Sequence, residues 1–306
     1  MKLFYTDIFV LPLPPGHHFP MEKYCRLRDR IVQKGLVNAD SLCVPLAATD
    51  AEITRAHDPA YLRRIVAGAQ SPQEIRRMGL PWTEQLVERA RRSSGATIAA
   101  CRSALSDGIG INLAGGTHHA FHDRAEGYCV FNDSAVAARA VLAEQHARRI
   151  LIVDCDVHQG NGTAAILAAD AAIFTFSMHG RKNFPHDKET SDLDIALEDG
   201  TEDAEYLDCL ARGLATAIDR ARPDLAVYLA GADPFYDDKF GRLALTMDGL
   251  LERDRYVLDT CSRAGIPVAV TMAGGYARQV GDTVEIHCNT VKAAVDLCSN
   301  KIESEL

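Results

Sequence analysis

The sequence predicts a single-domain, three-layer α/β/α protein with a mostly parallel central sheet. Short apolar runs alternate with longer amphipathic segments, most clearly through the second half of the chain. This alternation is typical of parallel strands joined by helices that cover both faces of a sheet. The 306 residues contain neither an internal repeat nor a recognisable linker, so we expect one domain over residues 1–306.

The expected elements follow from apolar periodicity and from residues that start or stop helices. Strands are expected at 2–5, 109–113, 150–153, 172–178, 225–229 and 267–271. Helices are expected at 21–35, 57–66, 84–106, 132–146, 163–169, from 201 onward, 246–264 and 280–298. Thr83, Asn132 and Thr201 stand where N-caps belong, and Pro59 suits the first turn of its helix. Prolines, glycines and polar residues predict irregular structure at 11–20, 68–81 and 180–200.

Composition narrows the class of protein. The net charge of −9 argues against a nucleic-acid partner, because phosphate binding requires a basic surface. No apolar run approaches the roughly 20 residues of a membrane span, and the first residues lack the apolar region of a signal peptide. The nine cysteines are odd in number and scattered, which favours reduced thiols. We therefore expect a cytoplasmic protein with no membrane span.

The stretch Ile150-Leu-Ile-Val-Asp154-Cys-Asp156-Val-His158 joins a buried strand to three polar side chains. Residues two apart in a strand share a side, and open α/β sheets place ligands at the carboxyl ends of their strands. Asp154, Asp156 and His158 are therefore expected to converge and suggest a metal site. The alternative is that the aspartates are solvated turn residues and the histidine is unrelated.

Three other predicted strands also end in polar turns that contain glycine. These turns carry the pair His118-His119, Asp233 and Tyr276, and a parallel sheet would bring all of them to the same edge as the first. Asp156, His158 and Asp233 would give a metal three protein ligands and an open position, as in catalytic sites. Such donors suit Zn²⁺ without excluding Fe²⁺, Mn²⁺ or Co²⁺. Each turn also has a purely structural interpretation, but their convergence favours a site.

The same residues suggest the parts of an amide hydrolase. A metal acidifies water and polarises a carbonyl, and a nearby histidine of the pair could remove the proton. Tyr276 could donate a hydrogen bond to the developing oxyanion. Asp154 and Asn161 could each accept an N–H from one of His118 and His119, which would fix tautomer and orientation.

Five motifs resemble the histone deacetylase family, zinc-dependent deacetylases with the arginase-like fold. They are Gly115-Gly-Thr-His-His-Ala120, Gly127-Tyr-Cys-Val-Phe-Asn132, Asp154-Cys-Asp-Val-His-Gln-Gly-Asn-Gly162, Ala230-Gly-Ala-Asp233 and Ala273-Gly-Gly-Tyr276. The motifs occur in the family's order within residues 17–280. Segments 79–82, 158–162 and 199–207 most resemble the class IV branch and its bacterial relatives.

The resemblance implies roles for the site residues. Asp156, His158 and Asp233 match the zinc ligands, with Fe²⁺ as an alternative metal. His119 matches the general base and acid, and His118 matches its electrostatic partner.

Further positions match the family's supporting residues. Asp154 and Asn161 match the groups that orient His118 and His119, and Tyr276 matches the oxyanion-stabilising tyrosine. The substrate tunnel is expected at Gly127, Tyr128, Phe184, Gly274 and Gly275. A structural potassium ion is expected beside Asp154, Asp156, His158, Ser177 and Met178.

The chain departs from the family pattern at a few positions. Asn161 stands where some members have aspartate, and Tyr128 replaces the more usual phenylalanine. An amide orients a histidine but raises its basicity less than a carboxylate does. These departures bear on substrate preference rather than on the type of reaction.

We therefore expect a metal-dependent hydrolase of N-acyl-lysine, in a peptide or protein, or of a small acylated amine such as an acetylpolyamine. A dinuclear manganese amidinohydrolase is a rival that shares the general fold but needs further aspartates, and only Asp237 and Asp238 lie near Asp233. A non-catalytic acyl-lysine binding module is a rival of another class. Acyl-chain length and oligomeric state stay open at this point.

Overall fold

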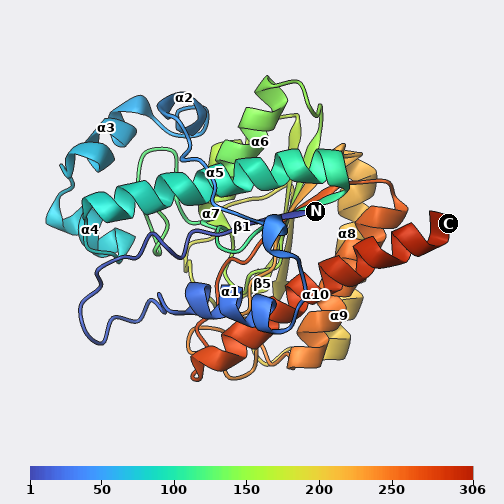
Figure 1. Ribbon diagram of the computed structural model, residues 1–306. Helices are drawn as coiled ribbons and strands as arrows, with labels where there is room; N and C mark the ends of the chain where they lie inside the picture. The colour runs from blue at the N-terminus through green and yellow to red at the C-terminus, as the bar shows by residue number, and fades with distance from the viewer. Residues whose placement is uncertain (306) are drawn as a thin grey trace.

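The computed structural model describes residues 1–305, which include one eight-stranded sheet in the order β2-β1-β3-β8-β7-β4-β5-β6 (Figure 1). All neighbouring strands run parallel, which confirms the predicted parallel sheet. The strands are β1 (Lys2–Phe4), β2 (Leu42–Cys43), β3 (Ile109–Asn112), β4 (Ile150–Asp154), β5 (Ile173–Gly180), β6 (Leu193–Leu197), β7 (Leu225–Leu229) and β8 (Val268–Thr271).

Helices cover both faces of the sheet, giving the predicted three layers. One apolar core lies under α5 (Glu84–Asp107), α6 (Asp133–Ala143) and α7 (Asn161–Leu167). The other lies under α1 (Lys23–Gln33), α8 (Asp203–Ala221), α9 (Met247–Arg263) and α10 (Val280–Glu305). In β4, Ile150 and Ile152 join the first core, whereas Leu151 and Val153 join the second. This alternation explains the unbroken apolar run, because both faces of the strand are buried.

Residues 68–81 do not form the expected loop. They contain α4 (Pro72–Met78), which lies with α2 (Asp50–Ile53) and α3 (Pro59–Ala67) around the first half of α5 (Figure 1). Ser71 and Glu74 form a reciprocal capping box, Pro72 opens the helix, and Gly79 ends it in the left-handed region with φ +75°. Serine, proline and glycine therefore mark the two ends of a short helix here, so the prediction of irregular structure was wrong.

Residues 180–200 also contain an unpredicted element, the edge strand β6, which pairs with β5. Its side chains are mostly half-buried, so it lacks the apolar run that marks a central strand. Thr201 is not the N-cap of the following helix. Glu202 takes that position, and the Thr201 hydroxyl donates instead to the carbonyl of Glu198 at 3.0 Å.

Other helix boundaries agree with the sequence. Thr83 and Asn132 accept hydrogen bonds from the backbone N–H groups of Leu86 and Ala135, as expected of N-caps. The short β2 and the 3₁₀ turn at Ala39–Ser41 were not predicted, and α10 runs several residues beyond the expected end. Among the described residues, no helix is long and apolar enough to cross a membrane.

The order of the strands positions the site. Strands β3, β8, β7 and β4 are consecutive neighbours in the sheet. Because all four run parallel, the turns that follow them lie side by side at one edge. The histidine pair, Tyr276, Asp233 and the Asp156–His158 pair belong to these turns.

Candidate active site

The three predicted metal ligands form one compact cluster. One potential ligand atom from each of Asp156, His158 and Asp233 lies within 4.8 Å of the others. His158 Nδ1 is 2.9 Å from Asp156 Oδ1 and 3.3 Å from Asp233 Oδ2. Backbone groups hold the carboxylates, since Gly274 N–H donates to Asp156 Oδ2 at 2.8 Å and Val157 N–H donates to Asp233 Oδ1 at 2.9 Å.

The cluster fits a divalent cation. Asp233 Oδ2 is buried and accepts no hydrogen bond within the described part of the chain, although such atoms in proteins are nearly always satisfied. Burial, together with the charge of Asp156, raises the pKa of Asp233 to about 6. Two buried carboxylates and an imidazole are donors that zinc and iron(II) both accept. A cation would therefore satisfy the free oxygen and offset the repulsion between the carboxylates.

His118 is coupled to Asp154. Its Nδ1 lies 2.7 Å from Asp154 Oδ2, and its Nε2 lies 3.8 Å from Asp156 Oδ1. Burial by itself lowers the pKa of His118, but the two carboxylates outweigh it and raise that pKa to about 9. Asp154 thus stabilises positive charge on this imidazole, as well as fixing its orientation.

His119 is oriented through the neutral amide of Asn161, which in turn is held by the Glu126 carboxylate. Its Nδ1–H donates to Asn161 Oδ1 at 2.7 Å, and Asn161 Nδ2 donates to Glu126 Oε1 at 3.1 Å. The second contact sets which way the amide points. Nδ1 is therefore occupied, and Nε2 is left as the other ring nitrogen of a residue that lines the cavity. Burial, followed by the charges of His118 and His158, holds the pKa of His119 well below its ordinary value.

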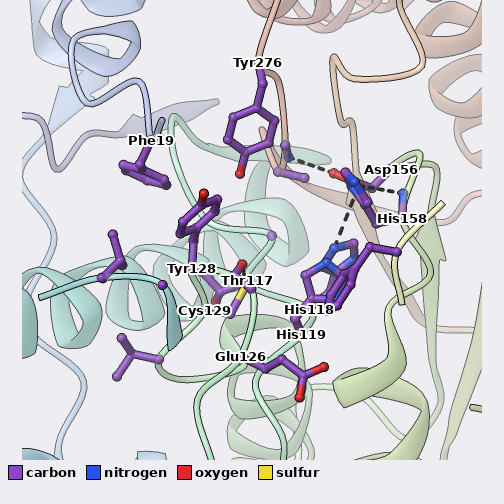
Figure 2. A pocket seen from close by; sticks show the side chains of 18 of the residues that line it. Phe19, Thr117, His118, His119, Glu126, Tyr128, Cys129, Asp156, His158 and Tyr276 are labelled. Atoms are coloured by element: carbon purple, nitrogen blue, oxygen red, sulfur yellow. Dashed lines mark hydrogen bonds and ion pairs between the residues drawn. The ribbon is translucent and has the colours of Figure 1, made fainter. Parts of the chain in front are cut away.

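Tyr276 lies on the opposite side of the same space from the histidine pair, with Asp156 and His158 beside it (Figure 2). Its backbone N–H donates to Asp238 Oδ2 at 2.6 Å, which ties the turn after β8 to the loop after β7. Burial raises the pKa of the Tyr276 phenol well above its ordinary value. The hydroxyl therefore keeps its proton and can donate a hydrogen bond.

These groups line a cavity of about 740 Å³. Gly127, Tyr128, Phe184 and Gly274, four of the five predicted tunnel residues, line it. The rings of Phe184 and His119 meet edge to face with centroids 4.9 Å apart. Gly275 is buried and is not among the lining residues, and a Cβ built on it would meet Thr283 and Ala232, which do not line the cavity either.

Comparison with known proteins agrees with this geometry. The sequence model described as the histone deacetylase domain matches residues 17–291. The chain belongs to the histone deacetylase family. An uncharacterized protein of Picosynechococcus is 42% identical over 96% of this chain and 98% of its own length. Histone deacetylase 2 of Arabidopsis thaliana is 28% identical over 91% of this chain and 76% of its own. The acetoin utilization protein AcuC of Staphylococcus aureus is 30% identical over 79% of this chain and 67% of its own.

Solved structures show the same fold. The crystal structure of a histone deacetylase homolog from Aquifex aeolicus aligns with a TM-score of 0.83 and 21% identity, covering 96% of this chain and 83% of that one. The HD domain of HDA15 aligns with a TM-score of 0.82 and 19% identity, covering 96% of this chain and 88% of that one. Membership of the family supports a deacetylase or deacylase activity that depends on a metal.

Sequence reasoning missed three residues of the site. Glu126 orients Asn161, Asp238 holds the turn of Tyr276, and Lys23 lines the cavity with its Nζ 3.2 Å from the carbonyl oxygen of Ala273. Glu126 directly precedes the Gly127-Tyr128 motif, and this adjacency could have indicated that it belongs to the site. Lys23 lies on α1, and no local pattern links it to a turn 250 residues later.

Proposed function

We propose that this protein hydrolyses the amide bond of N-acyl-lysine in a peptide or protein and acts as one catalytic unit over residues 1–306. The observation that carries the proposal is the convergence of a three-ligand cluster, an oriented histidine pair and a protonated tyrosine on one cavity. Asp156, His158 and Asp233 would hold Zn²⁺, with Fe²⁺ as the alternative. When bound there, the metal polarises the amide carbonyl and makes water a better nucleophile.

His119 moves the proton in this proposal. His119 lines the cavity, and its low pKa keeps the imidazole neutral and able to accept a proton from the attacking water. Asn161 and Glu126 fix the proton on Nδ1, so that Nε2 is the atom that accepts. The same nitrogen then gives the proton to the leaving lysine amine.

In this proposal His118 and Tyr276 stabilise charge that develops during the reaction. The carboxylate of Asp154 lets His118 carry positive charge beside His119, which makes it an electrostatic partner rather than a second base. The Tyr276 hydroxyl donates a hydrogen bond to the oxyanion that forms as the carbonyl is attacked. A donor of this kind typically contributes a factor of about 10² to 10³ in kcat.

The supporting predictions belong to the same proposal. Gly127, Tyr128, Phe184 and Gly274 would enclose the lysine side chain. A potassium ion would lie where Asp154 pairs in register with Ser177, at the junction of β4 and β5. Acylated small amines, including acetylpolyamines, are the alternative substrates.

The dinuclear manganese rival lacks the ligands that it needs. Among the described residues, only one group of three or more metal-binding side chains lies close enough to hold an ion. Asp237 instead pairs with Arg278 at 3.1 Å. Asp238 is engaged by the N–H groups of Phe240, Gly241 and Tyr276.

Two substitutions test the proposal. His119→Ala and Tyr276→Phe should each leave a folded protein with unchanged metal content that hydrolyses an acetyl-lysine peptide at least about a hundredfold more slowly. His146→Ala, which removes an exposed histidine that is not among the residues lining the cavity, is the matched control. Near wild-type rates in either site variant would refute the assigned roles, and tight peptide binding without turnover by the wild type would favour a binding module.

A further inference from the structure

Lysines and arginines outnumber carboxylates among the side chains that line the cavity. Apart from the metal ligands and histidines, six cations line it, namely Lys23, Arg76, Arg77, Arg89, Lys182 and Arg242. Glu126 is the one other carboxylate among the lining residues. The chain as a whole carries a net charge of −9. The lining of the cavity therefore has an excess of positive charge, opposite in sign to the net charge of the whole chain.

The inner cations are engaged by the protein itself. Lys23 donates to the carbonyl oxygens of Ala273 and Gly275, and its side chain is buried. Arg89 is also buried, and its guanidinium donates to two backbone carbonyls of the N-terminal segment at 2.8 and 3.1 Å. The charges available to an arriving substrate are consequently those at the mouth.

Four exposed cations form this mouth, which we call the basic rim: Arg76, Arg77, Lys182 and Arg242. Arg76 and Arg77 occupy the last turn of α4, and neither forms an ion pair within the described residues. Lys182 and Arg242 share a single carboxylate, Asp199, at 3.7 and 3.2 Å. The rim therefore keeps an excess of positive charge.

Glu126 does not cancel this excess. It accepts a hydrogen bond from Asn161 and lies 3.7 Å from the guanidinium of Arg124. Its carboxylate is thus committed to the wall of the cavity and to a neighbouring arginine.

We propose that the basic rim selects acyl-lysines that lie within acidic peptide segments and discriminates against acetylated polyamines. This inference rests on the proposed function and names its substrate class. A peptide bound with its acyl-lysine in the cavity places the flanking residues at the mouth, where a glutamate meets the rim arginines and a lysine is repelled. An acetylpolyamine brings further positive charge to the same place.

The expected size of the effect follows from exposed ion pairs. Each such pair contributes at most about 1 kcal/mol, which is about fivefold. Two flanking glutamates compared with two flanking lysines should therefore change kcat/KM by about tenfold at low ionic strength, within the ceiling that two such pairs set. The difference should shrink as salt is added, because rim and substrate charges are both exposed to solvent.

The test uses three acetyl-lysine peptides that differ only in the two residues beside the acetyl-lysine: glutamate, glutamine or lysine. N-Acetylputrescine is the small-amine probe. The dissociation constant is measured by fluorescence anisotropy and kcat/KM by amine release, both across a salt series. The variant R76E/R77E reverses the charge of the two rim arginines that form no ion pair, and R76Q/R77Q neutralises them with a milder change to α4.

The control variant R148E/R255E makes the same change in net charge elsewhere. Arg148 is 91% exposed just before β4, whose opposite end carries the site, and Arg255 pairs with Glu252 on α9. The proposal is supported if affinity and kcat/KM both decrease from the glutamate peptide through the glutamine peptide to the lysine peptide. This order should be lost in R76Q/R77Q, reversed in R76E/R77E and kept in the control variant.

The inference is overturned if the three peptides bind alike, if the order survives in both rim variants, or if N-acetylputrescine is the best substrate. Failure of the proposed function has a different signature, because no acetyl-lysine peptide would then be hydrolysed by the metal-loaded protein. Peptide binding would still report the preference of the rim in that case.

Discussion

His57 offers a quantitative test of how the loop that carries the histidine pair is held. The imidazole is fully buried between that loop and the start of α6. Its Nδ1–H donates to the carbonyl of Phe121 at 2.9 Å, and its Nε2 accepts the N–H of Asn132 at 2.9 Å. Both nitrogens are satisfied only when the ring is neutral, because a proton on Nε2 would face the Asn132 N–H.

Burial accordingly lowers the pKa of His57 from 6.5 to about 4. The unfolded chain takes up a proton below about pH 6.5, whereas the folded protein resists it until about pH 4. The stabilisation is therefore fully present above about pH 6.5 and is lost as the pH falls towards 4. The difference between the two pKa values corresponds to about 3 kcal/mol, of which about 2 kcal/mol is lost by about pH 5.

Urea denaturation of the metal-free protein at about pH 7 and about pH 5 measures this loss. The wild type should lose about 2 kcal/mol more than His57→Gln between these conditions, because glutamine keeps one donor and one acceptor but does not titrate. His146→Gln, at an exposed histidine, should behave like the wild type. Equal losses in the wild type and His57→Gln would refute the reasoning.

Three further predictions concern the site itself. Asp238→Asn should lower kcat about tenfold or more through the turn of Tyr276, so its effect should be far from additive with that of Tyr276→Phe in a double-mutant cycle. Gly274→Ala should abolish tight metal binding, because the added Cβ would lie 1.9 Å from Asp233 Oδ2, whereas Gly281→Ala meets nothing within 4 Å. Removing the metal with a chelator should abolish amide hydrolysis. It should also lower the free energy of unfolding by about 3 kcal/mol, compared with protein in a metal concentration about a hundred times the Kd.

Each of these has a clear contrary result. Additive effects of Asp238→Asn and Tyr276→Phe would show that the carboxylate does not act through the tyrosine. Metal titration by calorimetry should separate Gly274→Ala from Gly281→Ala, and equal affinities would contradict the close approach of Gly274 to the carboxylates. Full activity after exhaustive chelation would remove the metal from the reaction.

Parts of the fold were predictable because their signals are local. The apolar run of β4 marks a strand that is buried on both faces, and Thr83 and Asn132 mark helix starts through their own hydrogen bonds. The short α4 and the edge strand β6 were missed. Their stability comes from a capping box and from pairing with β5, neither of which leaves an apolar pattern.

The chain's own motifs determined which residues gather at the site. Asp154 ends β4, Asp156 and His158 follow it, and parallel neighbours had to bring Asp233 and Tyr276 to the same edge. Glu126, Asp238 and Lys23 were assigned only from the tertiary structure. Their partners lie 35, 38 and 250 residues away, and a hydrogen bond over such a separation depends on packing rather than on local sequence.

The charge of the cavity mouth also depends on the tertiary structure and could not be predicted from the sequence. Composition gives a chain of net charge −9, which by itself predicts an acidic surface. Only the folded chain brings the end of α4 together with the loops after β5 and β7, so that four cations surround one opening. The sequence by itself predicted a metal-dependent deacylase, because the groups that this reaction needs lie in short motifs at strand ends. The tertiary structure decided what surrounds the substrate, because that depends on which distant segments meet.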